Sequence, residues 1–544
     1  MARQASTPVP FSKSVRKDTA VLMSSARAGV VVPAGYFPLL PGDSCSGSVG
    51  IDVQLKEMPK PLLNGVTARF QAWCVPKDAF PQYSGSDELR HAMTGHVIKA
   101  LGSADRTPPP FFSTITGATL STALNSAMFK ILGIHVPTSA TINTDLVDAF
   151  ALVNNFRRAA HSPKIPRWKY AAEDIAIATS LPPAFWPSSR FAHVVPDYER
   201  ALVVGSLDLD VIAGQVPVKG ISRIGGIFSA GASYSGDASA VTINPTGTSS
   251  TVGGMKFNIT SAGVSSIFAD MAAQTIGVSL NDIDMARKTQ AFAKARAAMD
   301  GADATGFDNG DSIIALLMQG LDVPTDEFRR PWLLASKIVG VGMVERNATD
   351  GASLDKSVTL GRASATLSLN VPQLERGGIV IFTIEVLPER IDERMSDEYL
   401  FATNIDHLPN ALRDVQRTEP VDIVTKRRID VKHSTPDGLY GYEPMNFKWN
   451  RDFTRCGGVF YQPTPGAGWT ENRAAIWQTE IVNPEFGTTH YLAPSPFPHD
   501  VFSDQLGDAF EFVTRHAVSI VGLTQMGDPL MENSDDYVEV VTAG

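Results

Sequence analysis

The sequence predicts a mainly β protein with long loop insertions and a few helices. Three observations support this fold class: segments with the two-residue alternation of strands, Gly and Pro spread along the whole chain, and two long stretches almost without charge. The 544 residues include 44 Gly and 36 Pro, and 43% are hydrophobic against 19% charged. Frequent Gly and Pro argue against an all-helical protein. The small share of charge indicates that much of the surface faces protein.

The first clear strand signal lies at residues 49–55, where apolar Val and Ile alternate with polar residues up to Leu55. This is the period of a half-buried strand. Residues 66–75 (VTARFQAWCV) predict a second strand, because β-forming residues follow the Asn64-Gly65 turn signal and end at Pro76.

Further strands are expected in the second half of the chain. Residues 379–387 (IVIFTIEVL) follow Gly377-Gly378, end at Pro388 and are apolar on both faces, which predicts a central strand. Residues 517–523 and 537–542 predict two more strands near the end.

Two helices are expected. Residues 143–160 place Leu146, Phe150 and Val153 on one face, with Asn143 or Thr144 as the N-cap. Residues 281–299 carry Met and Phe every seven residues, and Gly301 ends the segment. We interpret this Met and Phe stripe as core packing and not as a cofactor site.

Two insertions are almost uncharged. Residues 211–280 contain five charged residues in 70, while Gly, Ser and Thr together supply 28. Enough apolar residues remain to predict short strands there in place of disorder. Residues 107–142 carry a single charge, Lys130. Weakly charged insertions suggest surfaces that are buried against neighbouring subunits.

Positive charge concentrates at the start of the chain. Residues 1–30 have a net charge of +4, whereas the rest of the chain has −14, which gives a total of −10. Phosphate attracts clustered Lys and Arg, so we interpret residues 1–30 as a basic arm that either contacts nucleic acid or clamps neighbouring subunits. Its candidate residues are Arg3, Lys13, Arg16, Lys17 and Arg27.

A second basic cluster follows the first predicted helix and mixes positive charge with aromatic rings. This combination binds single strands through phosphate contacts and base stacking. An exposed basic helix end that only solvates the surface is an equally good interpretation. The candidate residues are Arg157, Arg158, Lys164, Arg167, Trp168, Lys169 and Tyr170.

Motifs for catalysis, cofactors or metals are not found in the sequence. It contains no Walker or GxGxxG pattern, no HExxH, no closely paired cysteines and no GxSxG elbow. The carboxylates between Glu385 and Glu398 are interleaved with Arg390 and Arg394, so we expect a solvated ion-pair network there and not a glycosidase pair. We therefore expect no enzymatic activity, no cofactor, no metal site and, because no long apolar run occurs, no membrane insertion.

Six segments stand out in order along the chain: 35–43 (GYFPLLPGD), 328–333 (FRRPWL), 375–388, 397–399 (DEY), 440–460 (YGYEPMNFKWNRDFTRCGGVF) and 510–530. Together they resemble the major capsid proteins of the Microviridae, which are small icosahedral single-stranded DNA bacteriophages. The segment at 440–460 is the best match, although Phe447 stands where the family usually has Tyr. The resemblance covers about two thirds of the chain, mostly after Asp282.

The resemblance implies an eight-stranded jelly-roll capsid barrel and a T=1 icosahedral shell around a circular single-stranded DNA genome. It also implies a virion location, assembly in the host cytoplasm, and four kinds of partner: copies of the chain itself, a DNA pilot protein, a small DNA-binding protein and a host receptor. The expected organisation is an interior arm at 1–30, the first part of the barrel at 31–210 with its insertion at 107–142, a surface protrusion for host attachment at 211–280, and the remainder of the barrel with long loops at 281–544.

Two other functions remain open on the sequence alone. A carbohydrate-binding or carbohydrate-active β-sandwich could use tryptophans as sugar platforms. A phage attachment or fibre protein would favour repeats, and no fixed-period repeat is visible. The tryptophans are Trp168, Trp186, Trp449, Trp469 and Trp477.

Overall fold

The structure is a computed structural model, and its chain divides into two compact units: Met1–Glu199 with Arg296–Gly544, and Arg200–Ala295. In the second unit, strands β7 (Ile221–Arg223) and β8 (Gly226–Phe228) pair antiparallel. They confirm short strands for these six residues. The structure describes residues 12–83, 86–98, 105–116, 127–136, 140–162, 164–171, 180–187, 189–197, 221–223, 226–228, 288, 329–347, 357–415, 417, 421–451, 454–461, 474–479 and 481–527.

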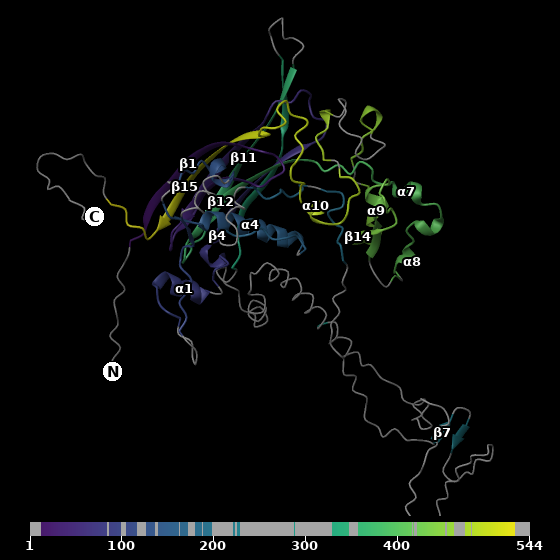
Figure 1. The fold of residues 1–544 in the computed structure, drawn as a ribbon, viewed down its shortest axis with the longest axis horizontal. Helices are drawn as coiled ribbons and strands as arrows, with labels where there is room; N and C mark the ends of the chain where they lie inside the picture. Colours follow the sequence, from purple (N-terminus) through teal and green to yellow (C-terminus); the bar gives the residue numbers. More distant parts are fainter. Residues whose placement is uncertain are drawn as a thin grey trace, which may run out of the picture. The chain divides into compact units, whose positions relative to one another are not determined.

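The first unit is built on two antiparallel sheets (Figure 1), which confirms a mainly β fold. The five-stranded sheet has the order β1 (Ser14–Ala26), β15 (Phe510–Gly522), β3 (Ser44–Leu55), β11 (Ser357–Val371) and β10 (Gly342–Asn347). The four-stranded sheet has the order β2 (Val32–Leu39), β12 (Gly378–Pro388), β4 (Val66–Pro76) and β9 (Trp332–Gly340).

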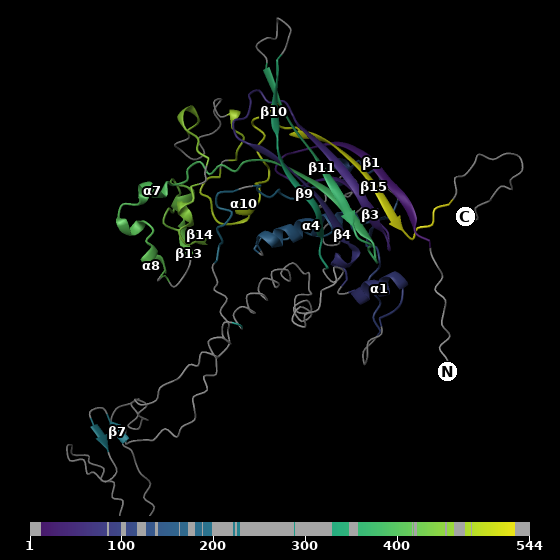
Figure 2. The ribbon, with the colours of Figure 1, turned by 180° about the vertical axis from the view of Figure 1, so that it is seen from behind.

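Strand pairing in the two sheets is nested. The first strand pairs with the last, β1 with β15, and inside this pair lie β2 with β12, β3 with β11 and β4 with β9. Only Val341 separates β9 from β10. The chain therefore passes at Val341 from the four-stranded sheet to the edge of the five-stranded sheet. Figure 2 shows β10 extending from the end of the sheets.

The two sheets face each other across one apolar core. Phe37 of β2 and Phe382 of β12 lie 5.6 and 5.7 Å, centroid to centroid, from His516 of β15 in the opposite sheet. The predicted alternation at 49–55 is confirmed, because every second residue of β3 is buried there. Inward apolar residues from both sheets make the core, as alternation along each strand requires.

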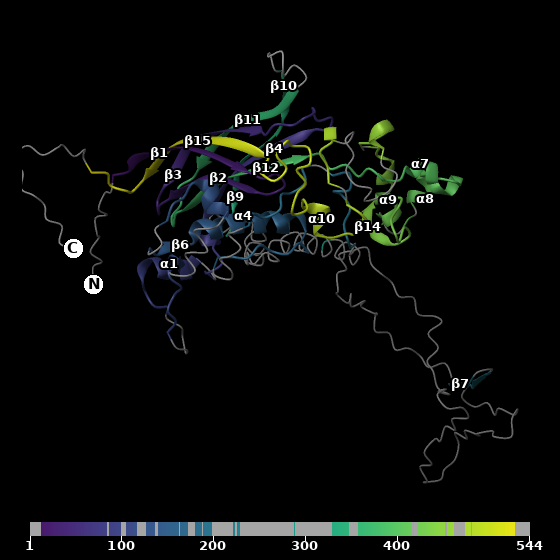
Figure 3. The ribbon, with the colours of Figure 1, turned by 45° about the horizontal axis from the view of Figure 1, so that its top comes forward.

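The predicted strand at 379–387 is confirmed as a central strand. β12 lies between β2 and β4, and all its residues after Gly378 are buried. The reason is a third layer: helix α4 (Asp145–His161) packs on β12 and β4 from the side away from the five-stranded sheet, as Figure 3 shows. A strand covered on both faces has no solvent side, so its sequence does not alternate.

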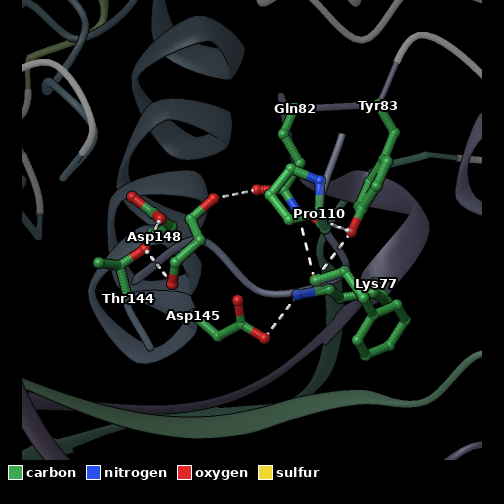
Figure 4. A network of polar contacts seen from close by, with 9 residues as sticks. Lys77, Gln82, Tyr83, Pro110, Thr144, Asp145 and Asp148 are labelled. Carbon is green, nitrogen blue, oxygen red and sulfur yellow. Dashed lines mark hydrogen bonds and ion pairs between the residues drawn. The ribbon is translucent and has the colours of Figure 1, made fainter. Parts of the chain in front are cut away.

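Helix α4 confirms the helix predicted at 143–160. Thr144 is its N-cap residue, although its Oγ1 donates to Asp148 Oδ2 (2.7 Å) and caps no backbone N–H (Figure 4). Leu146, Phe150 and Val153 are buried as expected. Polar residues on the other sides of α4 are buried too, because the segment at 164–171 folds back on the helix and forms hydrogen bonds with Asp148 and Asn155.

The remaining described elements of the first unit are short. β5 pairs with β6, and β13 pairs with β14. Within the described ranges, no helix is long and apolar enough to cross a membrane. These elements are η1 (Lys77–Ala79), α1 (Ser86–Thr94), β5 (Thr114–Ile115), α3 (Ala127–Leu132), β6 (Ile142–Asn143), α7 (Glu398–Phe401), η4 (Ile405–His407), α8 (Ala411–Val415), β13 (Val421–Thr425), α9 (Lys426–Ile429), β14 (Leu439–Pro444), η5 (Phe447–Trp449), η6 (Gly458–Phe460) and α10 (Thr488–Tyr491).

Strand β1 was not predicted, because residues 14–26 were assigned to a basic arm. The usual burial of apolar and charged side chains is reversed in part of β1. Val15 and Met23 are exposed, whereas Arg16 and Asp18 face inward. Arg16 forms an ion pair with buried Asp43, and Asp18 contacts His516 at 2.9 Å. Charge partners inside the sheet therefore replace the usual apolar signal. Residues 14–26 of the predicted arm therefore form an edge strand, and the interior position of the arm stays a prediction.

Several other expectations cannot be compared with the structure. Residues 1–11, the helix expected at 281–299 apart from Lys288, the strand expected at 537–542, and most of the insertion at 211–280 lie outside the described residues.

A buried carboxylate joins α4 to the four-stranded sheet. Glu385 of β12 forms ion pairs with Arg157 of α4 and with Arg69 of β4, the latter at 3.1 Å. The Arg157 guanidinium also lies over the Phe185 ring, 4.1 Å from its centroid. Two cations and one anion thus share an interior site, where removal of one member leaves uncompensated charge.

We expect the substitution Glu385→Ala to lower the free energy of unfolding by about 3–5 kcal/mol, because it leaves two guanidinium groups buried without their carboxylate. Urea unfolding of the purified chain measures this. The matched control is Glu511→Ala, which removes the exposed ion pair with Lys56 and should cost less than about 1 kcal/mol. Equal losses in the two variants would contradict the prediction.

Candidate nucleic-acid interface

The second basic cluster lies on a loop that is held against the end of α4. Asn155 on the helix donates from Nδ2 to the backbone oxygen of Trp168 (2.8 Å), and the Trp168 backbone N–H donates back to Asn155 Oδ1 (2.5 Å). This reciprocal pair fixes the loop at its middle. The side chains on either side of Trp168 are therefore presented from a defined position.

Three cations of this loop are exposed: Lys164, Arg167 and Lys169. Trp168 and Tyr170, on either side of Lys169 in the sequence, are half-buried. The Arg167 guanidinium lies 5.7 Å from the Tyr170 ring centroid. Lys164 forms an ion pair with Asp197. Exposed cations beside partly exposed rings are the arrangement that contacts a single strand by charge and stacking.

Arg157 and Arg158 do not belong to this surface, which corrects the sequence interpretation. Both are buried. Arg157 is bound to Glu385, and Arg158 donates to the backbone oxygen of Pro166 (2.7 Å). Burial lowers the pKa of Arg158 to about 10. These two guanidinium groups stabilise the helix and its loop, so they are not available to phosphate in this conformation.

The candidates near the start of the chain lie on or beside β1. Lys17 is exposed, and Lys13 donates to Gln373 Oε1 (3.1 Å). Arg16 is bound to Asp43. Arg27 donates to the backbone oxygen of Leu506 (2.9 Å) and contacts His499. Arg3 lies outside the described residues.

The two groups of cations do not form one surface. The loop at 162–171 follows α4, which covers the four-stranded sheet, whereas β1 is the edge of the five-stranded sheet (Figure 3). The described candidates therefore form two separate patches, on opposite layers of the first unit.

The carboxylates at 385–398 form an ion-pair network, as expected, but much of it is buried and not solvated. Glu385 is enclosed by arginines, and Arg390 pairs with Asp392 at 3.2 Å. Asp397 accepts from Arg451 and Arg455, both at 2.7 Å, and the hydrogen bond from Arg455 is the main cause of its lowered pKa. These carboxylates stabilise loops, and their ion pairs give no support to a glycosidase pair.

Some of the tryptophans considered as sugar platforms lie in the core of the described part of the chain. Trp186 and Trp477 are buried, and the Trp477 indole donates to the backbone oxygen of Pro498 (2.9 Å). Trp168 and Trp449 are half-buried, and Trp469 lies outside the described residues. Two of the five candidates are therefore core residues.

Nucleophile and metal chemistry find little support in the described residues. Cys45 and Cys74 are buried, Cys456 is half-buried, and burial raises the pKa of Cys45 to about 11. A thiol with a raised pKa is a poor nucleophile. The described residues contain no group of three or more His, Cys, Asp or Glu side chains that could hold a metal ion.

A small apolar cluster beside this network contains a buried histidine. Tyr440 hydroxyl and His490 Nδ1 are 2.9 Å apart, and Phe486 stacks on the His490 ring at 4.4 Å. Burial, followed by the nearby Arg390 guanidinium, lowers the pKa of His490 to about 3. His490 is therefore neutral at physiological pH.

One surface was missed by the sequence analysis. The described residues between 398 and 423, from α7 into β13, expose large apolar side chains and are called here the apolar lobe. Short helices interrupted by Pro409 have no sustained period, so this segment carries no amphipathic signal. The exposed residues are Tyr399, Leu400, Phe401, Ile405, Leu412, Val415 and Ile423.

No family model matches the sequence, and no curated protein is significantly similar to it.

We expect the double variant Arg167→Gln/Lys169→Gln to bind a short oligo(dT) more weakly and with a smaller salt dependence. Loss of two phosphate contacts should reduce the slope of log K against log salt by about 1.4, because each contact on a single strand contributes about 0.7. Fluorescence anisotropy at several salt concentrations measures the slope.

The control variant Lys56→Gln/Lys60→Gln removes two positive charges outside the loop at 164–171. It should keep the native slope of log K against log salt. Lys13→Gln/Lys17→Gln tests the patch on β1 separately. An unchanged slope in the Arg167 and Lys169 variant would remove this loop from the candidate interface.

We expect the stability of the chain to fall as the pH decreases from about 6.5, in part because of His490. The unfolded chain binds a proton near pH 6.5, whereas buried His490 binds one only near pH 3. Above pH 6.5 neither state carries this proton, so His490 does not reduce the free energy of unfolding. Between pH 6.5 and pH 3 only the unfolded chain binds it, so the free energy of unfolding falls by up to about 1.4 kcal/mol per pH unit. His490→Gln should flatten urea-unfolding stability between pH 7 and pH 5, and an identical pH slope would contradict this assignment.

Proposed function

We propose that this chain is a structural capsid subunit that assembles with copies of itself into an icosahedral shell around single-stranded DNA. The observation that carries this proposal is the apolar lobe. Leu412 and Val415 are 81% and 86% exposed, and five other large apolar side chains are exposed within the same short segment. Monomeric proteins rarely expose large contiguous apolar patches, whereas subunit interfaces bury them.

The strand order supports a viral jelly roll. A jelly roll consists of eight strands in two Greek keys, so that strands one and eight, two and seven, three and six, and four and five are neighbours. The four nested pairs from β1·β15 to β4·β9 have this order. In the proposal, β10 is the continuation of β9 in the second sheet.

The apolar lobe lies beside the sheets and does not cover their core. Figure 1 shows α7, α8, α9 and β14 together at one side of the sheets. The chain that follows the apolar lobe enters a small core, where Val424 and Ile429 are buried. Anchored there, the lobe can present its exposed side chains to a neighbouring subunit. The buried ion pair between Arg428 and Glu443 stabilises this anchor.

The remaining parts of the proposal rest on the resemblance. They are a T=1 shell in the virion, assembly in a bacterial host, a circular genome, a pilot protein and a small DNA-binding protein as partners, and a receptor-contacting protrusion at 211–280. The exposed cations at Lys164, Arg167 and Lys169 support contact with DNA. The carbohydrate-binding alternative loses support, because two of its candidate platforms are core tryptophans.

We expect Leu412→Glu/Val415→Glu to abolish particle formation and to leave the chain folded. Both side chains are largely exposed in the single chain, so the substitutions cost little folding energy, but they would place two charges in a buried interface. Analytical ultracentrifugation and negative-stain imaging measure assembly, and circular dichroism measures folding.

Leu506→Glu is the matched control, because Leu506 is 89% exposed and lies outside the apolar lobe. It should fold like the native chain. Its particle yield shows whether glutamate at any exposed leucine causes the same loss of assembly. Normal particles from the Leu412 and Val415 variant would reject the lobe as an assembly surface.

A further inference from the structure

Four strands lie at the edges of the two sheets, and β1 is the least protected of them. Native proteins protect an edge strand from pairing with other chains by proline, a bulge or short length. β2 contains Pro33 and Pro38 and is bulged, β9 is bulged as well, and β10 has only six residues. β1, the outermost strand of the five-stranded sheet (Figure 2), has 13 residues in one unbroken register with β15.

One side of the β1 backbone points away from the sheet. Within the described residues, the backbone from Val15 to Ser25 forms hydrogen bonds with β15 alone. In an antiparallel ladder, every second residue turns its N–H and C=O away from the partner strand. An extended segment of another chain can therefore add to β1 through main-chain hydrogen bonds. Water satisfies these groups as well, so the side chains decide whether a partner is expected.

The outward side chains of β1 are apolar at positions where an exposed sheet face is normally polar. Val15, Val21 and Met23 are 61%, 57% and 77% exposed. By contrast, the exposed positions of β11 in the same sheet, from Arg362 to Asn370, hold Arg, Ser, Thr and Asn. Apolar side chains gathered at an open sheet edge indicate a surface that a partner covers.

The positions of these side chains fit a second copy of the same strand. When two antiparallel copies meet across a two-fold axis, each residue lies opposite the residue that is equally far from the axis. With the axis at Thr19, Val15 of each copy lies opposite Met23 of the other, and the two Thr19 side chains face each other. Apolar pairs and Thr–Thr pairs stabilise antiparallel strands, whereas an axis at Lys17 or Asp18 would place like charges opposite each other.

The charges of β1 do not oppose this pairing. Inward charge can protect an edge strand from other chains. Here Arg16 is bound to Asp43, and Asp18 contacts His516 at 2.9 Å, so both charges have partners within the chain. Exposed Lys17 lies opposite an apolar residue in this register, where its stem can pack while its ammonium group stays in water.

We propose that β1 pairs antiparallel with β1 of a second copy across a two-fold axis at Thr19, and that the two five-stranded sheets join into one continuous sheet. The two pairs of Val15 with Met23 close the ends of the interface. This dimer does not depend on the proposed function, because the contact uses no residue of the apolar lobe. In a shell it would be the contact at a two-fold axis.

The test compares two double variants that differ only in charge. Val15→Glu/Met23→Lys places opposite charges at both ends of the interface, whereas Val15→Glu/Met23→Glu places like charges there. Within one chain the two positions lie about 26 Å apart along the strand, so they do not interact, and both variants should fold like the native chain. Sedimentation velocity measures dimerisation of the full-length chain, in the Leu412→Glu/Val415→Glu background to keep the apolar lobe out of the result.

Chains with native β1 and the variant with opposite charges should form dimers. The variant with like charges should dimerise at least about tenfold more weakly, since two unfavourable cross-strand pairs replace two favourable ones. Raising the salt concentration should narrow this difference, because salt screens exposed charges.

A cysteine at the axis tests the register. Thr19→Cys in a Cys456→Ser background should give a disulfide-linked dimer on mild oxidation, seen on a non-reducing gel, because directly opposite Cβ atoms lie about 4.5–5.5 Å apart. Cys456→Ser removes the half-buried thiol, and Cys45 and Cys74 are buried. Ser364→Cys is the matched control: Ser364 is exposed on the same sheet but belongs to β11, so this variant should stay monomeric on the gel.

A monomeric chain with native β1, equal dimerisation of the two charge variants, or equal cross-linking of Thr19→Cys and Ser364→Cys would each overturn the proposal. Pairing of β1 with any other segment would leave Thr19→Cys unlinked and would overturn it as well. If a charge variant does not fold, as judged by circular dichroism, the cysteine comparison still decides the question, because threonine and cysteine are similar in size.

Discussion

The pairing of the first strand with the last constrains everything in the first unit. β1 and β15 align over their whole length, from Ser14 against Gly522 to Ala26 against Phe510, and three further pairs lie inside this ladder. Connections between nested strands can lengthen without changing the ladders, because the entropy of loop closure grows only slowly with length. This is why one pair of sheets can carry long insertions, such as the one at 107–142.

Buried charge is the second constraint, because it connects layers that apolar packing alone would leave free to slide. Glu385 holds α4 through Arg157 and the neighbouring strand through Arg69. The pair of Lys77 and Asp145 similarly connects η1 to the start of α4. Such pairs contribute little net stability relative to apolar residues, but a shifted register would leave each charge without its partner. Their role is therefore to select one arrangement of the layers.

Two described surfaces support the proposed function. The apolar lobe exposes leucine and valine, and the loop after α4 exposes cations beside half-buried rings. Apolar side chains in water raise the free energy of the isolated chain unless a partner covers them, whereas exposed cations are solvated without such a cost. In the proposal, a neighbouring subunit would cover the apolar lobe, and phosphate would contact the cations.

The sequence by itself determined the mainly β class, the strands at 49–55, 66–75 and 379–387, and helix α4, because burial on one or both faces leaves a local apolar pattern. It did not determine β1, whose inward Arg16 is satisfied by Asp43, or the burial of Arg157, whose partner Glu385 is 228 residues away. The same limit applies to the candidate site: the exposed loop cations were found, but whether a cation is exposed or paired depends on contacts between distant residues. Only the tertiary structure decides those contacts, because an ion pair leaves no periodic signal in either partner's local sequence.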